Sequence, residues 1–224
     1  MAKYLIHSYK DRQWYVDKYL IPSMVKQGID RGDIDIFEDD GSLGCLEAFM
    51  QSCLMLEPEG GTWHLQDDVI ISSQFKRWTE EYAQNRVVCG FCSRYSKKCP
   101  PGLVYPDLMW YSFPCIYIPN VLAREFATWF YRETIYNPHY ESWISKKKFE
   151  DSIFMDYLQQ YCPGKQILNL APNIVNHIDY LLGGSIVNSN RVESIVHSIY
   201  WEEPELLSYW QTTIQKEEPD GKDI

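Results

Sequence analysis

Short apolar runs alternate with amphipathic stretches along the first 95 residues of the chain. Each run is too short for a helix and predicts a buried strand, whereas the stretches between them place apolar side chains at helical spacing. The strands are expected at residues 4–8, 34–37, 62–66 and 86–91. This alternation predicts a largely parallel sheet that is covered by helices on both faces.

Local signals refine the helix boundaries in this half of the chain. Asp11 is a candidate cap for the first helix, and Pro22 should kink that helix or start a new turn because proline lacks the amide hydrogen. Ser42 is the expected N-cap of a helix whose apolar face runs from Leu43 to Leu54. A third helix is centred on Phe75, Trp78 and Tyr82.

The second half of the chain is less regular. Residues 92–107 are rich in Lys, Pro and Gly and predict a long excursion, and segments of that kind are often lids or acceptor-binding loops. Further strands are expected at Leu108–Tyr111, Cys115–Ile118 and Gln166–Leu170. Helices should begin at Pro119-Asn120 and near Lys147.

Length and composition set the domain organisation. With 224 residues and 45% hydrophobic content, the chain can bury one substantial core. We therefore expect a single α/β domain over residues 1–205, built as three α/β/α layers around a mostly parallel sheet. A charged C-terminal tail is expected over residues 206–224, fraying from Lys216.

The charge balance disfavours several classes of protein. A formal net charge of −10 repels polyanions, so general nucleic-acid binding is not expected. No segment approaches the roughly 20 apolar residues that span a membrane, and the N-terminus lacks a signal-type apolar core. Seven cysteines, an odd number, fit reduced thiols. These features predict a soluble cytoplasmic protein.

The cysteines leave one metal alternative open. Cys89 and Cys92 form a CxxC pair, and Cys99 follows, but no second pair has matching spacing. Cys115 or His139 would have to complete a zinc site from a distance. Structural zinc therefore remains an alternative for this segment.

The segment Gly60–Ile71 carries the most informative chemistry. Its sequence, GGTWHLQDDVII, predicts a glycine-hinged turn, a short buried strand and two adjacent carboxylates where that strand ends. Burying an aspartate among Trp, Leu, Val and Ile is costly unless the charge is paired or binds a cation. Asp67 and Asp68 thus suit a divalent cation that bridges a diphosphate, although they could instead form an acidic turn that caps the helix near Phe75.

Three segments resemble the nucleotide-sugar-dependent glycosyltransferases of the GT-A fold, especially small bacterial and phage-type members. Leu5–Arg12 resembles the first nucleotide-facing loop of that family, and Trp63–Asp68 resembles its DxD-type motif. Pro172–Ile178, followed by Gly183-Gly184-Ser185, is similar to a late segment with a proline, a valine and a histidine. The resemblance covers roughly residues 3 to 190 and implies a GT-A-like single domain.

The resemblance implies a role for each matching residue. Asp68 and His177 would bind Mn²⁺ or Mg²⁺ with the diphosphate, and Asp67 would face the ribose or the donor sugar. The nucleotide pocket would be lined by Ser8, Arg12 and Asp39. Gln66 departs from the family, which usually has an acid there, and this leaves a metal-poor or degenerate site open. His177, next to isoleucine and valine, could equally be a hydrogen-bonded core residue.

An inverting transfer also needs a general base on the acceptor side. Glu150 and Asp151 begin a predicted helix and are similar to the acidic pair before the acceptor-side helix of many inverting members. Asp151 is the first candidate and Glu150 the second. Both could instead be ordinary charges at a helix N-terminus.

The sequence therefore predicts a metal-assisted transferase that moves a sugar from a nucleotide-sugar donor to an unidentified acceptor, either a glycan or a modified nucleobase. Two alternatives use the same residues. One is a metal-dependent nuclease or phosphatase, which the charge of −10 disfavours. The other is a catalytically silent sugar-binding or scaffold domain, which Gln66 favours. The donor, the stereochemistry and the oligomeric state stay open.

Overall fold

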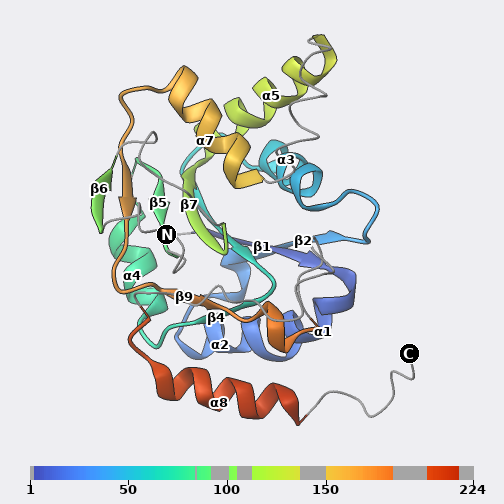
Figure 1. Cartoon of the computed structure of the whole chain (residues 1–224), viewed down its shortest axis with the longest axis vertical. Coiled ribbons are helices and arrows are strands. Elements are labelled where there is room, and N and C mark those ends of the chain that lie inside the picture. The colour runs from blue at the N-terminus through green and yellow to red at the C-terminus, as the bar shows by residue number, and fades with distance from the viewer. Residues whose placement is uncertain are drawn as a thin grey trace.

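The computed structural model describes residues 3–83, 85–91, 101–104, 113–136, 150–183 and 201–216. Over these residues the chain forms three layers, with a mixed, mostly parallel sheet between two groups of helices (Figure 1). This confirms the predicted α/β/α fold class. The strand expected at Leu108–Tyr111 lies outside the described residues.

The main sheet has the strand order β2-β1-β3-β7-β5-β8-β6. Its strands are β1 (Lys3–Tyr9), β2 (Ile34–Asp39), β3 (Gly61–Gln66), β5 (Val88–Cys89), β6 (Gly102–Val104), β7 (Cys115–Pro119) and β8 (Ile167–Asn169). Five of the seven run in one direction, whereas β7 and β6 are antiparallel to their neighbours. A separate antiparallel pair joins β4 (Val69–Ile71) to β9 (Val175–His177).

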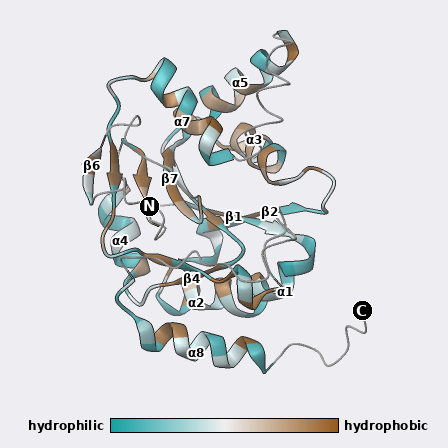
Figure 2. Ribbon diagram, viewed as in Figure 1, coloured by the Kyte–Doolittle hydropathy of each residue, from teal (hydrophilic) through white to brown (hydrophobic). Residues whose placement is uncertain are grey.

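Two apolar clusters hold helices on opposite faces of the sheet. One face carries α3 (Cys45–Met55), α5 (Asn120–Tyr136) and α7 (Glu150–Tyr161). The other carries α1 (Gln13–Tyr15), α2 (Ile21–Lys26), α4 (Phe75–Tyr82) and α8 (Pro204–Gln215). Figure 2 shows the central strands largely in the hydrophobic colour, with hydrophilic positions on the outer sides of the helices. The helices α5 and α7 thus bury the apolar side chains that the helical spacing predicts.

The first helical segment changes its winding before Pro22. A 3-10 turn at Lys10–Arg12 leads into α1, then into a π-helical turn at Val16–Leu20, and α2 begins at Ile21. Pro22 stands in the first turn of α2, where its missing amide hydrogen breaks no helical bond. The predicted new turn at Pro22 is therefore confirmed, and it is entered through a π turn rather than a sharp break.

The start of α3 differs from the prediction. The helix begins at Cys45, after Gly44 with φ of 76°, and not after Ser42. The physical reason is the carboxylate of Asp39, which accepts hydrogen bonds from the amides of Gly41 at 2.9 Å and Leu43 at 3.3 Å. These bonds hold residues 39–43 in a turn and delay the helix.

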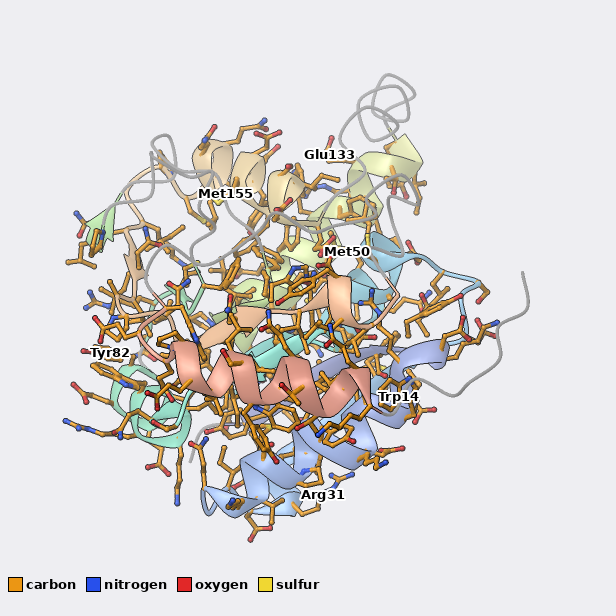
Figure 3. The ribbon with its side chains drawn as sticks, turned by 60° about the horizontal axis from the view of Figure 1, so that its bottom comes forward. Trp14, Arg31, Met50, Tyr82, Glu133 and Met155 are labelled. Atoms are coloured by element: carbon orange, nitrogen blue, oxygen red, sulfur yellow. The ribbon has the colours of Figure 1, made fainter. Side chains whose placement is uncertain are left out.

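The C-terminal segment also differs from the prediction, because α8 covers residues 206–215 of the expected tail. Ile214 is fully buried, and Trp210 makes an edge contact with Tyr19 at 5.3 Å between ring centroids. Figure 3 turns this side forward and shows α8 lying across it. The apolar residues of this segment lie between two acidic stretches, Glu202–Glu205 and Glu217–Asp220, and these stretches suggest a charged tail. No helix in the described ranges is long and apolar enough to cross a membrane.

We expect Gly61→Ala to destabilise the domain by about 1–3 kcal/mol, because overpacking forces a buried neighbour to move. A Cβ atom on Gly61 would overlap the hydroxyl and ring of Tyr117, which packs against Trp63. Gly164→Ala is the control, since its Cβ meets nothing within 4 Å and the residue is exposed. Urea unfolding of both variants measures the difference; equal stability would show that Tyr117 moves away freely.

Candidate functional site

The acid pair lies in the turn between β3 and β4. β3 is a central strand between β1 and β7, and its four inner residues are buried. Asp67 and Asp68 follow its last residue, after which β4 leaves the main sheet. The two carboxylates therefore lie at the carboxyl edge of the parallel strands, where the sequence predicts them and where ligands of such sheets bind.

Backbone pairing between β4 and β9 brings His177 to Asp68. Val69 is opposite His177 in the ladder, and the amide of Ile178 donates to the carbonyl of Asp68 at 2.8 Å. The amide of Ser72 donates to the carbonyl of Ile174 at 2.9 Å at the other end of the same pair. The position of the histidine is thus fixed by main-chain bonds.

Arg12 forms a buried ion pair with both acids. Its Nη1 donates to Oδ1 of Asp67 at 3.1 Å and to Oδ2 of Asp68. The three residues are 4%, 5% and 7% exposed. Since an unpaired buried charge is strongly unfavourable, the guanidinium compensates two carboxylates that would otherwise repel each other.

Both oxygens of Asp67 have partners within the protein. Its second oxygen, Oδ2, accepts the amide hydrogen of Tyr9 at 2.6 Å. The predicted contact with ribose or donor sugar would have to share these oxygens with Arg12 and Tyr9. In this structure Asp67 instead ties the end of β1 and the following turn to the end of β3.

Asp68 divides its two oxygens between different partners. Oδ2 binds Arg12, whereas Oδ1 lies 3.1 Å from Nε2 of His177. This is an ion-pair distance, but Oδ1 makes no aligned hydrogen bond to any described residue. On the other side of the ring, Nδ1 of His177 lies 3.5 Å from Oδ1 of Asp179, which is itself buried.

The charges of this cluster shift one another's pKa values. Burial raises the pKa of Asp67 to about 6, and the charge of Asp68 adds to the effect. Burial also disfavours the charged form of Asp68, but His177 and Arg12 outweigh it and lower its pKa. Burial opposes the charge of His177 as well, yet Asp68 raises the pKa of the imidazole. The cluster is therefore close to neutral overall when His177 is protonated.

Oδ1 of Asp68 and Nε2 of His177 could act as two ligands of a divalent cation once His177 has lost its proton. Adjacent ligands of an octahedral ion with bonds of about 2.1 Å are separated by about 3.0 Å, which matches the observed 3.1 Å. No group of three or more His, Cys, Asp or Glu side chains in the described part of the chain is arranged to hold a metal. Further ligands would therefore have to come from a diphosphate and water, as is common for Mg²⁺.

Other predicted residues line the same edge of the sheet. Ser8 precedes Tyr9 and donates its hydroxyl to Oε1 of Gln13 at 2.7 Å. Asp39 pairs with Tyr9 across the β1–β2 ladder and holds the turn before α3. Both are buried in local contacts and neither touches the acid pair directly.

A second polar group, formed by Gln66, Glu150 and Asp151, lies where the end of β3 meets the start of α7. Nε2 of Gln66 donates to Oε1 of Glu150 at 3.1 Å. Glu150 is 7% exposed, whereas Asp151 is partly exposed. Burial raises the pKa of Asp151 to about 7, and the neighbouring Glu150 adds to that shift.

Two participants were not predicted from the sequence. The amide of Tyr9 binds Asp67, and no side-chain signal marks a backbone donor. Asp179 is two residues after His177, and that H-x-D spacing is the signal that could have identified it. Of the cysteines considered for zinc, Cys89 is buried and donates to the carbonyl of Phe91 at 2.9 Å, while Cys92 and Cys99 lie outside the described residues.

Comparisons with known proteins add little to this geometry. No protein-family model and no curated protein sequence matches the chain. Among solved structures, it is similar to a crystal structure of HddC from Yersinia pseudotuberculosis and to that protein complexed with GMP-PN. In each case the TM-score is 0.33 and the identity 9%, over 56% of this chain and 80% of the other. Such a weak likeness carries no argument about function.

We expect Arg12→Met to destabilise the domain by about 3–5 kcal/mol near neutral pH, because it leaves two buried carboxylates uncompensated. The folded-state pKa values of Asp67 and Asp68 should then rise, so the loss of stability should shrink as the pH falls and the acids become protonated. Urea unfolding at neutral and mildly acidic pH measures both effects.

Arg77→Met is the matched control for this variant. The Arg77 side chain is 71% exposed and lies 4.0 Å from Glu81, so its removal should change stability by less than about 0.5 kcal/mol. A pH-independent loss in Arg12→Met would contradict the electrostatic account of the cluster.

Proposed function

We propose that this chain is a glycosyltransferase that moves a sugar from a nucleoside-diphosphate donor to an acceptor hydroxyl, assisted by Mn²⁺ or Mg²⁺. The observation that carries the proposal is the pair formed by Asp68 Oδ1 and His177 Nε2, 3.1 Å apart at the carboxyl edge of the sheet. The resemblance of the segments around Asp68 and His177 to GT-A enzymes supports it.

On the donor side, Asp68 and His177 would hold the cation, and the cation would neutralise the charge that develops on the departing diphosphate. Arg12 contributes a fixed positive charge beside the same acids. The acid pair is almost fully buried, so a donor diphosphate can reach it only if the groups that cover it are displaced. Binding of the donor should therefore be coupled to opening of the site.

On the acceptor side, Asp151 is the general base. Its pKa of about 7 suits a carboxylate that must take a proton at neutral pH. The acceptor oxygen forms a bond to the anomeric carbon, and the bond from that carbon to the diphosphate breaks with its electron pair on the diphosphate. The proton of the acceptor hydroxyl passes to Asp151.

One observation favours a second candidate, a catalytically silent sugar-binding or scaffold domain. Arg12 already compensates the buried acids, so they need no cation for their stability. Such a domain would keep the ion-pair cluster and bind no metal with the donor.

A thermal-shift panel of UDP, GDP, CDP and dTDP sugars, with and without Mn²⁺, separates the two candidates. A transferase should be stabilised by its donor only when the metal is present, by about 2.7 kcal/mol at a hundred times Kd. Asp68→Asn keeps the shape of the buried side chain and should abolish this metal-dependent shift.

Asp35→Asn is the control, because Asp35 is an exposed residue on β2. A flat panel for the wild-type chain would favour the silent domain. A wild-type response that survives in Asp68→Asn would remove Asp68 from the metal site.

We expect Asp151→Asn to slow release of the nucleoside diphosphate by about 10²–10⁴-fold, the usual contribution of a general base. Slow donor hydrolysis, in which water takes the place of the acceptor, supplies the assay. Because Asp151 lies on the acceptor side, the donor-dependent thermal shift should persist. If Asp151→Asn loses the donor-dependent thermal shift but releases nucleoside diphosphate at the wild-type rate, Asp151 belongs to the donor side instead.

A further inference from the structure

Gln66 directly precedes Asp67 and Asp68, and its side chain makes a contact that this position does not suggest. It is the last residue of β3, immediately before Asp67, and its side-chain amide reaches Glu150 at the start of α7, 84 residues later. The bond therefore joins the strand end that precedes Asp67 and Asp68 to the helix that carries the proposed base.

Glu150 is buried, and its carboxyl group is stabilised by a hydrogen-bond donor at position 66. Its Oε1 accepts from Gln66, its carboxyl group is hydrogen-bonded to the thiol of Cys45, and Oε2 has no partner among the described residues. An acid at position 66 would set two carboxylates about 3 Å apart, and both could not remain charged. The side-chain amide of Gln66 can donate a hydrogen bond to the Glu150 carboxylate at the start of α7, which a second carboxylate could not do.

We propose that Gln66 is a positioning residue that clamps the carboxylate of Glu150 and thereby fixes Asp151, the acceptor-side base, against the end of β3. The inference rests on the proposed transferase function and deepens it. It also accounts for the amide that stands where the resembling enzymes usually have an acid.

The clamp acts through both position and charge. α7 begins at Glu150, so anchoring this side chain fixes the first turn of the helix and the adjacent Asp151. Burial is the largest cause of the raised pKa of Asp151, and the charge of Glu150 raises that pKa further. The amide of Gln66 stabilises the charge of Glu150. Within the described part of the chain, the other titratable groups that act on Glu150 are Cys45 from α3 and Asp68 from the turn after β3.

An NMR titration tests the clamp without any ligand. The full chain is labelled with ¹³C at the aspartate carboxyl groups, and the signal that disappears in Asp151→Asn is assigned to Asp151. Asp151 should titrate near neutral pH in the wild-type chain. Glu150→Gln removes the neighbouring charge and should lower that pKa by on the order of one unit. Gln66→Met should lower it in the same direction, because Glu150 without its donor holds its proton to higher pH.

The double variant gives the sharpest result. If Gln66 acts through Glu150, then Gln66→Met combined with Glu150→Gln should shift Asp151 no further than Glu150→Gln alone. Additive shifts, or no shift in Gln66→Met, would overturn the proposal. If Gln66→Met does not fold, Gln66→Asn, whose amide is one methylene shorter, replaces it with the same expectation.

Gln51→Met is the matched control, because Gln51 also donates to a glutamate, Glu47, at 3.0 Å, but within α3. It should leave the Asp151 titration unchanged. If a nucleotide sugar stabilises the chain, its hydrolysis to nucleoside diphosphate can be measured as a function of pH. The acid limb of that profile should move to lower pH in both Gln66→Met and Glu150→Gln. If a nucleotide sugar stabilises the chain but the substitutions at Gln66 and Glu150 shift the Asp151 pKa independently, the clamp is refuted and the transferase is not. If no nucleotide sugar stabilises the chain, the transferase is refuted.

Discussion

The buried contact of Arg12 with Asp67 and Asp68 is the interaction on which the site depends. Two adjacent carboxylates cannot stay charged in an apolar interior unless a cation compensates them. Arg12 comes from the turn after β1 and the acids from the turn after β3, so one guanidinium fixes the edge of two neighbouring parallel strands. The amide of Tyr9 adds a main-chain bond to the same junction.

Different kinds of bond hold the two sides of the site. Backbone pairing of β4 with β9 places His177 beside Asp68. A side-chain hydrogen bond between Gln66 and Glu150 connects α7 to the end of β3. Substitutions remove a side-chain bond more easily than a backbone ladder, so the contact with α7 is the more easily altered of the two.

The same ion pairs bear on the proposed metal site. Arg12 is bonded to Oδ2 of Asp68 and Oδ1 faces His177, so a cation on Oδ1 would replace the contact between Asp68 and His177 and leave the contact with Arg12 in place. The paired charges stabilise the buried acids, whereas the proposed donor diphosphate would have to displace the groups that cover them. In the proposed function, the stability of this cluster and access for a donor therefore oppose each other.

The sequence alone determined the layered α/β architecture and the position of the acid pair, because short apolar runs and turn residues are local signals. It also identified Arg12, Asp68 and His177 as members of one site through resemblance. It failed at Ser42, where the Asp39 carboxylate delays α3, and at residues 206–215, which contain no acid but lie between two acidic stretches. Only the tertiary structure decided that Arg12 pairs with both acids and that Gln66 binds Glu150. Those contacts join residues 55 to 84 positions apart, and no local pattern encodes which polar partners meet when strands and helices pack.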